Sequence, residues 1–182
     1  ITCRDWFQLC LKEGLTVFRD SQFTADRRSA SVKRINDVIN LRGRQFREDN
    51  GPLAHPVRPD SFVEINNFYT ATVYEKGAEL IRMLKTLIGD AAYAKAVAIY
   101  FDRHDGDAAT IEDWLAVFED STGRDLSQFK IWYEQAGTPR LSVHDSFENG
   151  RYILHFKQHT PETPGQIKKD PRVIPCPLHT SD

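Results

Sequence analysis

Residues 6–18 read WFQLCLKEGLTVF, and this stretch has the residue spacing of one amphipathic helix. Positions three and four apart lie on the same face of a helix. The apolar stripe that this spacing predicts contains Trp6, Leu9, Cys10 and Val17. Glu13 stands in the middle of that stripe, where an ionised carboxylate is costly unless it is paired or binds a metal. We therefore expect Glu13 to face either a polar cavity or a cation.

The composition describes a globular protein of one domain or slightly more. The chain has 182 residues, of which 40% are hydrophobic and 11% aromatic, so it can form a core and is not of the disordered class. Its net charge of -2 gives no reason to expect a nucleic acid or a membrane as partner. The basic residues between Arg27 and Arg47 alternate with acidic ones, which predicts a solvated helix face rather than a phosphate-binding patch.

The cysteine content indicates the redox state of the protein's cellular compartment. The chain has three cysteines, Cys3, Cys10 and Cys176. An odd number without a C-x-x-C spacing argues against a disulfide framework and against a cysteine-based zinc site. We therefore expect a reducing compartment, the cytoplasm. No run is long and apolar enough to span a bilayer. The chain starts at Ile1 without a signal-peptide pattern, and we expect it to be a piece of a longer polypeptide.

Helical periodicity and stop signals predict an irregular bundle of short helices. We expect the first helix to end near Phe18 and a turn or short helix to follow it. Three prolines between Gly51 and Asn67 predict a long irregular loop, which is often functional in a compact domain. A T-x-x-E pattern at Thr72 predicts a capping box for the helix after it. The further helices are expected over 31–48, 73–88, 90–104, 110–122 and 127–136.

The pattern changes to strands after Pro139. Apolar and polar residues alternate around Val143 and again from Tyr152 to Phe156, and Asn149-Gly150 lies between them as a hairpin turn. Two or three strands are too few to be stable alone. We therefore predict a mainly α fold followed by the first strands of an incomplete β-sandwich domain, with the division into 1–137 and 138–182.

Several segments, taken together and in order, resemble the bacterial aminopeptidase N family of zinc metallopeptidases, a gluzincin family. The resemblance covers roughly residues 2 to 140, and the joint occurrence of the segments makes it specific. It implies that the helical part is the C-terminal part of a thermolysin-like catalytic domain. The segments are CRDWFQL (3–9), LKEGLTVFRD (11–20), AHPVRP (54–59), NFYT (67–70), VYEKGAE (73–79) and YFDRHDG (100–106), with WY (132–133) and GTP (137–139) after them.

The resemblance implies that Glu13, in its K-E-G context, is the third zinc ligand beside the two histidines of an H-E-x-x-H helix. A carboxylate with two imidazoles leaves an open position for water, as catalytic zinc requires. No H-E-x-x-H occurs in this sequence, and its six histidines are wrongly spaced for that motif. We expect the missing ligands shortly before Ile1, one zinc per full-length enzyme, and poor zinc retention by the fragment. The six are His55, His104, His144, His155, His159 and His179.

The resemblance also implies roles for four other residues. Tyr74 would donate a hydrogen bond to the oxyanion, because a phenol is a neutral donor at working pH. Tyr69 would line the pocket for the first side chain of the substrate, and Asn66 would lie near the bound peptide. Asp20 is a candidate hydrogen-bond acceptor that orients a zinc ligand.

The implied activity is metal-assisted removal of N-terminal amino acids from peptides that have a free N-terminus. Zinc would polarise the carbonyl group, and the glutamate of H-E-x-x-H would act as general base. That base and the anchor for the substrate amine are absent from these 182 residues, so we predict that the chain needs the remainder of its parent polypeptide and hydrolyses nothing alone.

Two other interpretations stay open at this point. Without the resemblance, Glu13 is most simply a helix-surface carboxylate near Lys12 or Arg19. The missing histidines would then favour a non-enzymatic, metal-free helical interaction module. An RNA-binding helix over residues 27–47 is disfavoured by its acidic residues. The upstream coding sequence separates the aminopeptidase interpretation from the interaction-module interpretation, because the enzyme requires an H-E-x-x-H motif there.

Overall fold

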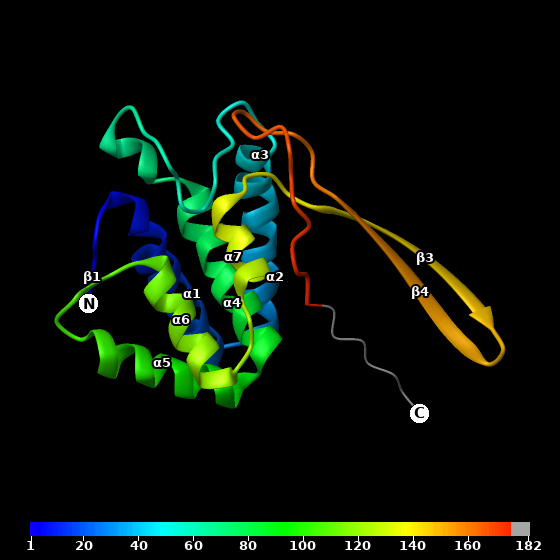
Figure 1. The fold of residues 1–182 in the computed structure, drawn as a ribbon, viewed down its shortest axis with the longest axis horizontal. Coiled ribbons are helices and arrows are strands. Elements are labelled where there is room, and N and C mark those ends of the chain that lie inside the picture. The colour runs from blue at the N-terminus through cyan, green and yellow to red at the C-terminus, as the bar shows by residue number, and fades with distance from the viewer. Residues whose placement is uncertain (176–182) are drawn as a thin grey trace.

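The computed structural model describes residues 1–175 and consists of a helical body with a long β-hairpin projecting from it (Figure 1). No helix in this described range is long and apolar enough to cross a membrane. The helices are α1 (Leu9–Arg27), α2 (Ala30–Asn40), α3 (Phe46–Asp49), α4 (Gly77–Ile88), α5 (Asp90–His104), α6 (Ile111–Thr122) and α7 (Ser127–Glu134). The strands are β1 (Thr2–Cys3), β2 (Ala108–Ala109), β3 (Arg140–Glu148) and β4 (Arg151–His159). The predicted fold class, mainly helical with strands after it, is confirmed.

The core lies where α4 packs against α1 and where α5 packs against α6. Burial of each large apolar side chain there contributes about 1.5–3 kcal/mol. The expected ends of two helices, at residues 88 and 122, are confirmed, and the residues that follow them, Gly89 and Gly123, both have a positive φ. The side chains with less than 2% exposure include Phe18, Phe68, Ile81, Leu84, Trp114, Phe118 and Tyr133.

The first helix differs from its prediction at both ends. It does not stop near Phe18 but continues to Arg27, because Gly14, Phe18 and Ser21 extend its buried face at helical spacing. The next helix is capped by Ser29, whose hydroxyl accepts the backbone N–H of Val32. Before α1, residues Trp6–Gln8 form a 3₁₀ turn, and Trp6 itself is 44% exposed. Trp6 therefore does not lie on a buried apolar stripe as its spacing predicts, whereas Trp114 and Trp132 are buried.

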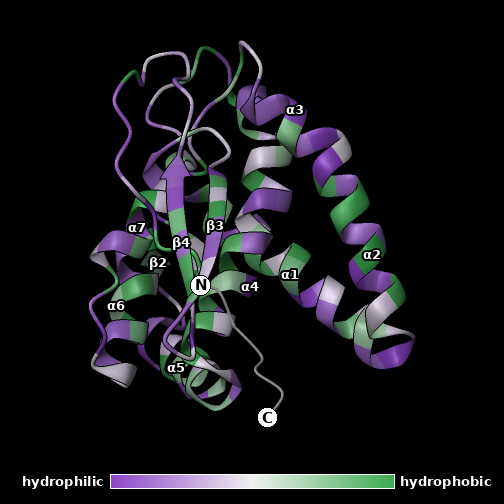
Figure 2. Ribbon diagram, turned by 90° about the vertical axis from the view of Figure 1, so that its right-hand side faces the viewer, coloured by the Kyte–Doolittle hydropathy of each residue, from purple (hydrophilic) through white to green (hydrophobic). Residues whose placement is uncertain are grey.

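The helix expected over residues 31–48 exists but is not a regular α-helix. It consists of α2, a π-helical turn at Leu41–Gln45, and α3. In Figure 2, hydrophobic and hydrophilic residues alternate along α2, which lies at the edge of the helical body. None of the α2 side chains is buried, and Val32, Ile35 and Ile39 are 57–64% exposed. The periodicity thus predicted the helix correctly without predicting burial.

The helix that carries Tyr74 also begins differently from its prediction. A π-helical turn at Thr72–Lys76 precedes α4, and the expected capping box at Thr72 does not form. The hydroxyl of Thr70 accepts the backbone N–H of Val73 instead, and the Thr72 side chain is turned to Glu48.

The predicted hairpin is confirmed. β3 and β4 pair antiparallel from Arg140↔His159 to Glu148↔Arg151, around a two-residue turn in which Asn149 and Gly150 have φ of 53° and 75°. A positive φ at both turn residues matches the twist of the strands. The hairpin extends away from the helices (Figure 1), and one of its faces is apolar and exposed. That face carries Leu141, Val143, Phe147, Tyr152 and Phe156.

Candidate functional site

The site is built where α1 crosses α4 at two glycines. A Cβ atom on Gly14 would lie 2.9 Å from the carbonyl carbon of Gly77, so only glycine allows this close approach of the two backbones. Glu13 precedes the first glycine, and Tyr74 stands three residues before the second. The crossing therefore brings the carboxylate of α1 next to the phenol of the π-helical turn.

Glu13 is largely shielded from water and only loosely paired. Its side chain is 16% exposed, and Lys12 Nζ lies 3.7 Å from its Oε1. The Lys12 side chain is 67% exposed, so this ion pair contributes little. Among residues 1–175, Lys12 is its one ion-pair partner. A shielded carboxylate with such a weak partner is suited to accept a stronger cation.

Tyr74 faces this carboxylate. The pKa of its phenol is raised, first by burial and then by the negative charge of Glu13 and by hydrogen bonding to it. A phenol is protonated at neutral pH in any case, so Tyr74 is a hydrogen-bond donor there, and the raised pKa extends this state to more alkaline pH. The ring of Tyr69 lies beside it, with ring centroids 6.3 Å apart, and is 54% exposed. Glu13, Tyr74 and Tyr69 thus form one cluster.

The other two predicted residues lie farther out. Asn66 is exposed on the 3₁₀ turn Ile65–Phe68, and its carbonyl accepts the backbone N–H of Tyr69 at 3.3 Å. Asp20 is exposed on α1 about two turns after Glu13. Within the described range its carboxylate has no hydrogen-bond or ion-pair partner from another residue.

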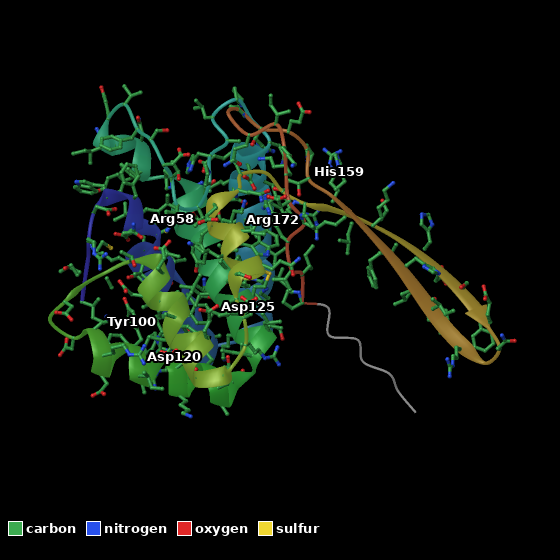
Figure 3. All side chains as sticks on the ribbon, in the orientation of Figure 1. Arg58, Tyr100, Asp120, Asp125, His159 and Arg172 are labelled. Carbon is green, nitrogen blue, oxygen red and sulfur yellow. The ribbon has the colours of Figure 1, made fainter. Side chains whose placement is uncertain are left out.

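The loop that leads to this cluster is fastened by Arg58 (Figure 3). Its backbone N–H donates to the carbonyl of Tyr133 at 2.9 Å, and its guanidinium contacts Glu112 of α6 and Glu134 of α7. Proline-rich residues 51–64 are therefore held against two helices, although they have no regular secondary structure. The 3₁₀ turn Ile65–Phe68, which carries Asn66 and is followed by Tyr69, comes after this attached loop.

Residues 1–175 provide one candidate ligand of a metal site and not a complete set of ligands. No group of three or more His, Cys, Asp and Glu side chains within residues 1–175 is arranged to hold a metal ion. Cys176 and His179 lie outside that range. Glu13 provides a single hard oxygen donor, which fits one ligand of a zinc site that takes its other ligands from elsewhere.

Sequence reasoning missed the contacts of four residues near Tyr74 in the structure: Glu48, Asp49, Thr72 and Lys76. The structure connects the first two to the last two by short hydrogen bonds. One signal was available, because Lys76 falls at helical spacing between the apolar Val73 and Leu80, where a lysine requires a buried partner.

Comparisons with known proteins identify the family of the chain. The profile of the peptidase family M1 domain matches residues 1–133, and a domain of unknown function with an Ig-like fold matches residues 137–181. Aminopeptidase N of Escherichia coli K12 is 53% identical over 184 residues, covering 100% of this chain and 21% of its own length. Aminopeptidase N of Caulobacter vibrioides is 62% identical over 148 residues, covering 81% and 17%. The chain thus spans about a fifth of the length of these relatives.

Two solved structures are similar as well. Aminopeptidase A of Legionella pneumophila, solved in complex with aspartic acid, superimposes with a TM-score of 0.72 at 34% identity over 87% of this chain and 18% of that one. An M1 zinc metallopeptidase from Deinococcus radiodurans has a TM-score of 0.60 at 18% identity, over 76% and 30%, and shows the shared fold. By its profile match and by these relatives, the chain belongs to peptidase family M1, in the bacterial aminopeptidase N group.

Proposed function

We propose that this chain is part of a zinc-dependent aminopeptidase that removes N-terminal amino acids from peptides. The observation that carries the proposal is the meeting of Glu13 and Tyr74 at the crossing of α1 and α4, in a chain of family M1. Glu13 is proposed to be one zinc ligand and Tyr74 the donor that stabilises the oxyanion. The histidine ligands, the general base and the amine anchor would come from outside these 182 residues, because the sequence has no H-E-x-x-H.

Each residue of the cluster has a chemical task in this proposal. Zinc, when bound, supplies a Lewis acid and a water of lowered pKa. Glu13 would hold the metal through its carboxylate. Tyr74, whose phenol is protonated at neutral pH, would donate its O–H to the negative charge that develops on the carbonyl oxygen of the scissile bond.

Three further residues would act on the substrate or on the ligands. The exposed ring of Tyr69 would form a wall for the first side chain of the substrate. The exposed amide of Asn66 would hydrogen-bond to the peptide, and Asp20 would accept a hydrogen bond that orients a zinc ligand. We also propose the division into domains 1–137 and 138–182, and the cytoplasm as the compartment, since Cys3 and Cys10 are free thiols.

The test uses the full-length polypeptide that contains this chain, expressed from its own coding sequence. We expect stoichiometric zinc and hydrolysis of an aminoacyl anilide. Tyr74→Phe should lower kcat about 10²–10³-fold with little change in KM, as removal of one oxyanion donor does in other enzymes. Tyr93→Phe is the matched control, because the buried Tyr93 hydroxyl has no hydrogen-bond partner within residues 1–175. A polypeptide without zinc and without turnover would instead support the metal-free interaction module, for which the exposed apolar residues of α2 are the favourable observation.

A further inference from the structure

Tyr74 stands in the middle of a π-helical turn. In this turn, Thr72–Lys76, the backbone N–H of Gly77 reaches back five residues to the carbonyl of Thr72. A second π-helical turn, Leu41–Gln45, lies against it. Such turns are rare, are frequent at functional sites, and persist only where the surrounding structure holds them. The side chains that hold this turn therefore decide where the Tyr74 phenol points.

The start of the turn is held by Glu48. Its carboxylate accepts the backbone N–H groups of Ala71 at 3.3 Å and Thr72 at 2.7 Å, and also the Thr72 hydroxyl. Gln45 donates to the same hydroxyl at 3.3 Å. Thr72 and Gln45 are 0% and 1% exposed, whereas the Glu48 side chain is 26% exposed. The Thr72 groups are therefore shielded from water, and leaving their hydrogen bonds unmade is costly.

The end of the turn is held by Asp49. Lys76 Nζ donates to Asp49 Oδ2 at 2.7 Å, and the two side chains are 8% and 1% exposed. Asp49 also accepts the backbone N–H of Gly137 at 2.7 Å and the Thr138 hydroxyl at 3.0 Å. Burial works to raise the pKa of Asp49, but the Lys76 charge and these hydrogen bonds outweigh it and hold that pKa below its ordinary value.

Thr72 and Lys76 lie two residues before and two residues after Tyr74. Side chains two positions apart point to opposite sides of a helix, so both attachments act on the face away from Glu13. From this arrangement we infer that Glu48 and Asp49 are positioning residues, which clamp the two ends of the π-helical turn and so aim Tyr74 at the carboxylate of Glu13. The consequence for turnover rests on the proposed function of Tyr74.

The first test is a double-mutant cycle in the zinc-loaded, full-length polypeptide that contains this chain. Thr72→Val keeps the shape of the side chain and removes the hydrogen bonds of its hydroxyl to Glu48 and Gln45, while the two backbone N–H groups still donate to Glu48. We expect kcat to fall roughly 10–100-fold at nearly constant KM, the loss that a small misplacement of a catalytic group causes. In a Tyr74→Phe background, Thr72→Val should cause no further loss, because it acts through the missing hydroxyl.

The matched control for this cycle is Glu79→Gln. Glu79 lies on α4, after the π-helical turn, and its carboxylate accepts a bidentate pair of hydrogen bonds from the guanidinium of Arg34 on α2. We expect this variant to keep the wild-type kcat and KM.

The second test needs no activity and uses the 182-residue chain. Replacing Asp49 alone would leave a buried lysine charge without a partner and risks unfolding, so the paired change Asp49→Leu with Lys76→Met is used. We expect the ring resonances of Tyr74, and its ring-to-ring NOE with Tyr69, to change in both this variant and Thr72→Val. The resonances of Trp114 and Tyr133, in the core, should stay as in the wild type.

The outcomes distinguish the two proposals. If Tyr74→Phe is fully active, the proposed function is wrong, and an altered Tyr74 ring would still support the positioning role. If Tyr74→Phe loses activity while Thr72→Val equals wild type, the positioning inference is overturned. Additive losses in the cycle, or an unchanged Tyr74 ring in both variants, would overturn it as well.

Discussion

Gly14 of α1 and Gly77 of α4 meet backbone against backbone, and the contact is not symmetric. A Cβ atom added to Gly14 would lie 2.9 Å from the Gly77 carbonyl carbon, whereas one added to Gly77 would come no nearer than 3.4 Å to the Gly14 Cα. The first distance is a clash with backbone that cannot move aside, and the second is an ordinary contact. The helix crossing that brings Glu13 to Tyr74 therefore has room for a Cβ atom at position 77 but not at position 14.

Alanine substitutions at these glycines should have different effects on the free energy of unfolding. Gly14→Ala should destabilise the chain by about 1–3 kcal/mol through overpacking, even though alanine favours the helix by about 1 kcal/mol. Gly77→Ala should be near neutral or stabilising. Urea unfolding of the 182-residue chain measures both, and equal effects of the two substitutions would contradict the asymmetric crossing.

The contact of Arg58 with Glu112 should give the chain a specific acid sensitivity. Burial works against ionisation of Glu112, but hydrogen bonds from Arg58 and Lys130 lower its pKa from 4.5 to about 2. Because the folded pKa is below the unfolded one, the pair contributes its full stability above about pH 4.5 and loses it as the pH falls toward 2. Glu112→Gln should therefore flatten the decline of unfolding free energy in this window.

A control for this pH dependence is Asp102→Asn. The Asp102 carboxylate is exposed and makes no ion pair within residues 1–175, so its removal should leave the decline between pH 4.5 and 2 unchanged. A decline that is equally steep with and without the Glu112 carboxylate would show that Arg58 does not hold it in the folded state.

The 182-residue chain alone should be inactive. It contains one proposed zinc ligand and neither the general base nor the amine anchor, so we expect weak zinc binding and no turnover of an aminoacyl anilide. Equilibrium dialysis against zinc and an anilide assay with added zinc check this. Measurable turnover by the purified chain would mean that the ligand set and the base lie within these residues after all.

Local sequence signals predicted much of the fold, because they act over a few residues. The Asn149-Gly150 turn and the stop at Gly123 depend on backbone conformations that few other residues adopt, and both are found. Tertiary packing decided the features that were mispredicted. α1 continues past Phe18 because Ser21 is buried by other helices, and Trp6 stays half exposed against Phe68, with ring centroids 6.3 Å apart.

For the site, the polar residue within an apolar stripe was the useful signal. It drew attention to Glu13, and the resemblance added Tyr74. The same signal was present at Lys76, a lysine at a buried helical position, but its partner Asp49 lies 27 residues away and periodicity does not identify it. The π-helical turns were also unpredictable, because an offset of five instead of four in the backbone hydrogen bonds leaves no mark on the residue pattern.

The most direct measurement is the zinc affinity of the full-length polypeptide that contains this chain, by competition with a chromophoric chelator. Glu13→Gln is compared with the wild type and with Glu79→Gln, which removes a carboxylate of α4 outside the cluster. If Glu13 is a zinc ligand, Glu13→Gln should weaken zinc binding by at least about 10–100-fold, the loss seen when even outer-shell partners are removed, while Glu79→Gln binds as the wild type. Equal zinc affinity of Glu13→Gln and the wild type would contradict the assignment of Glu13 as a ligand.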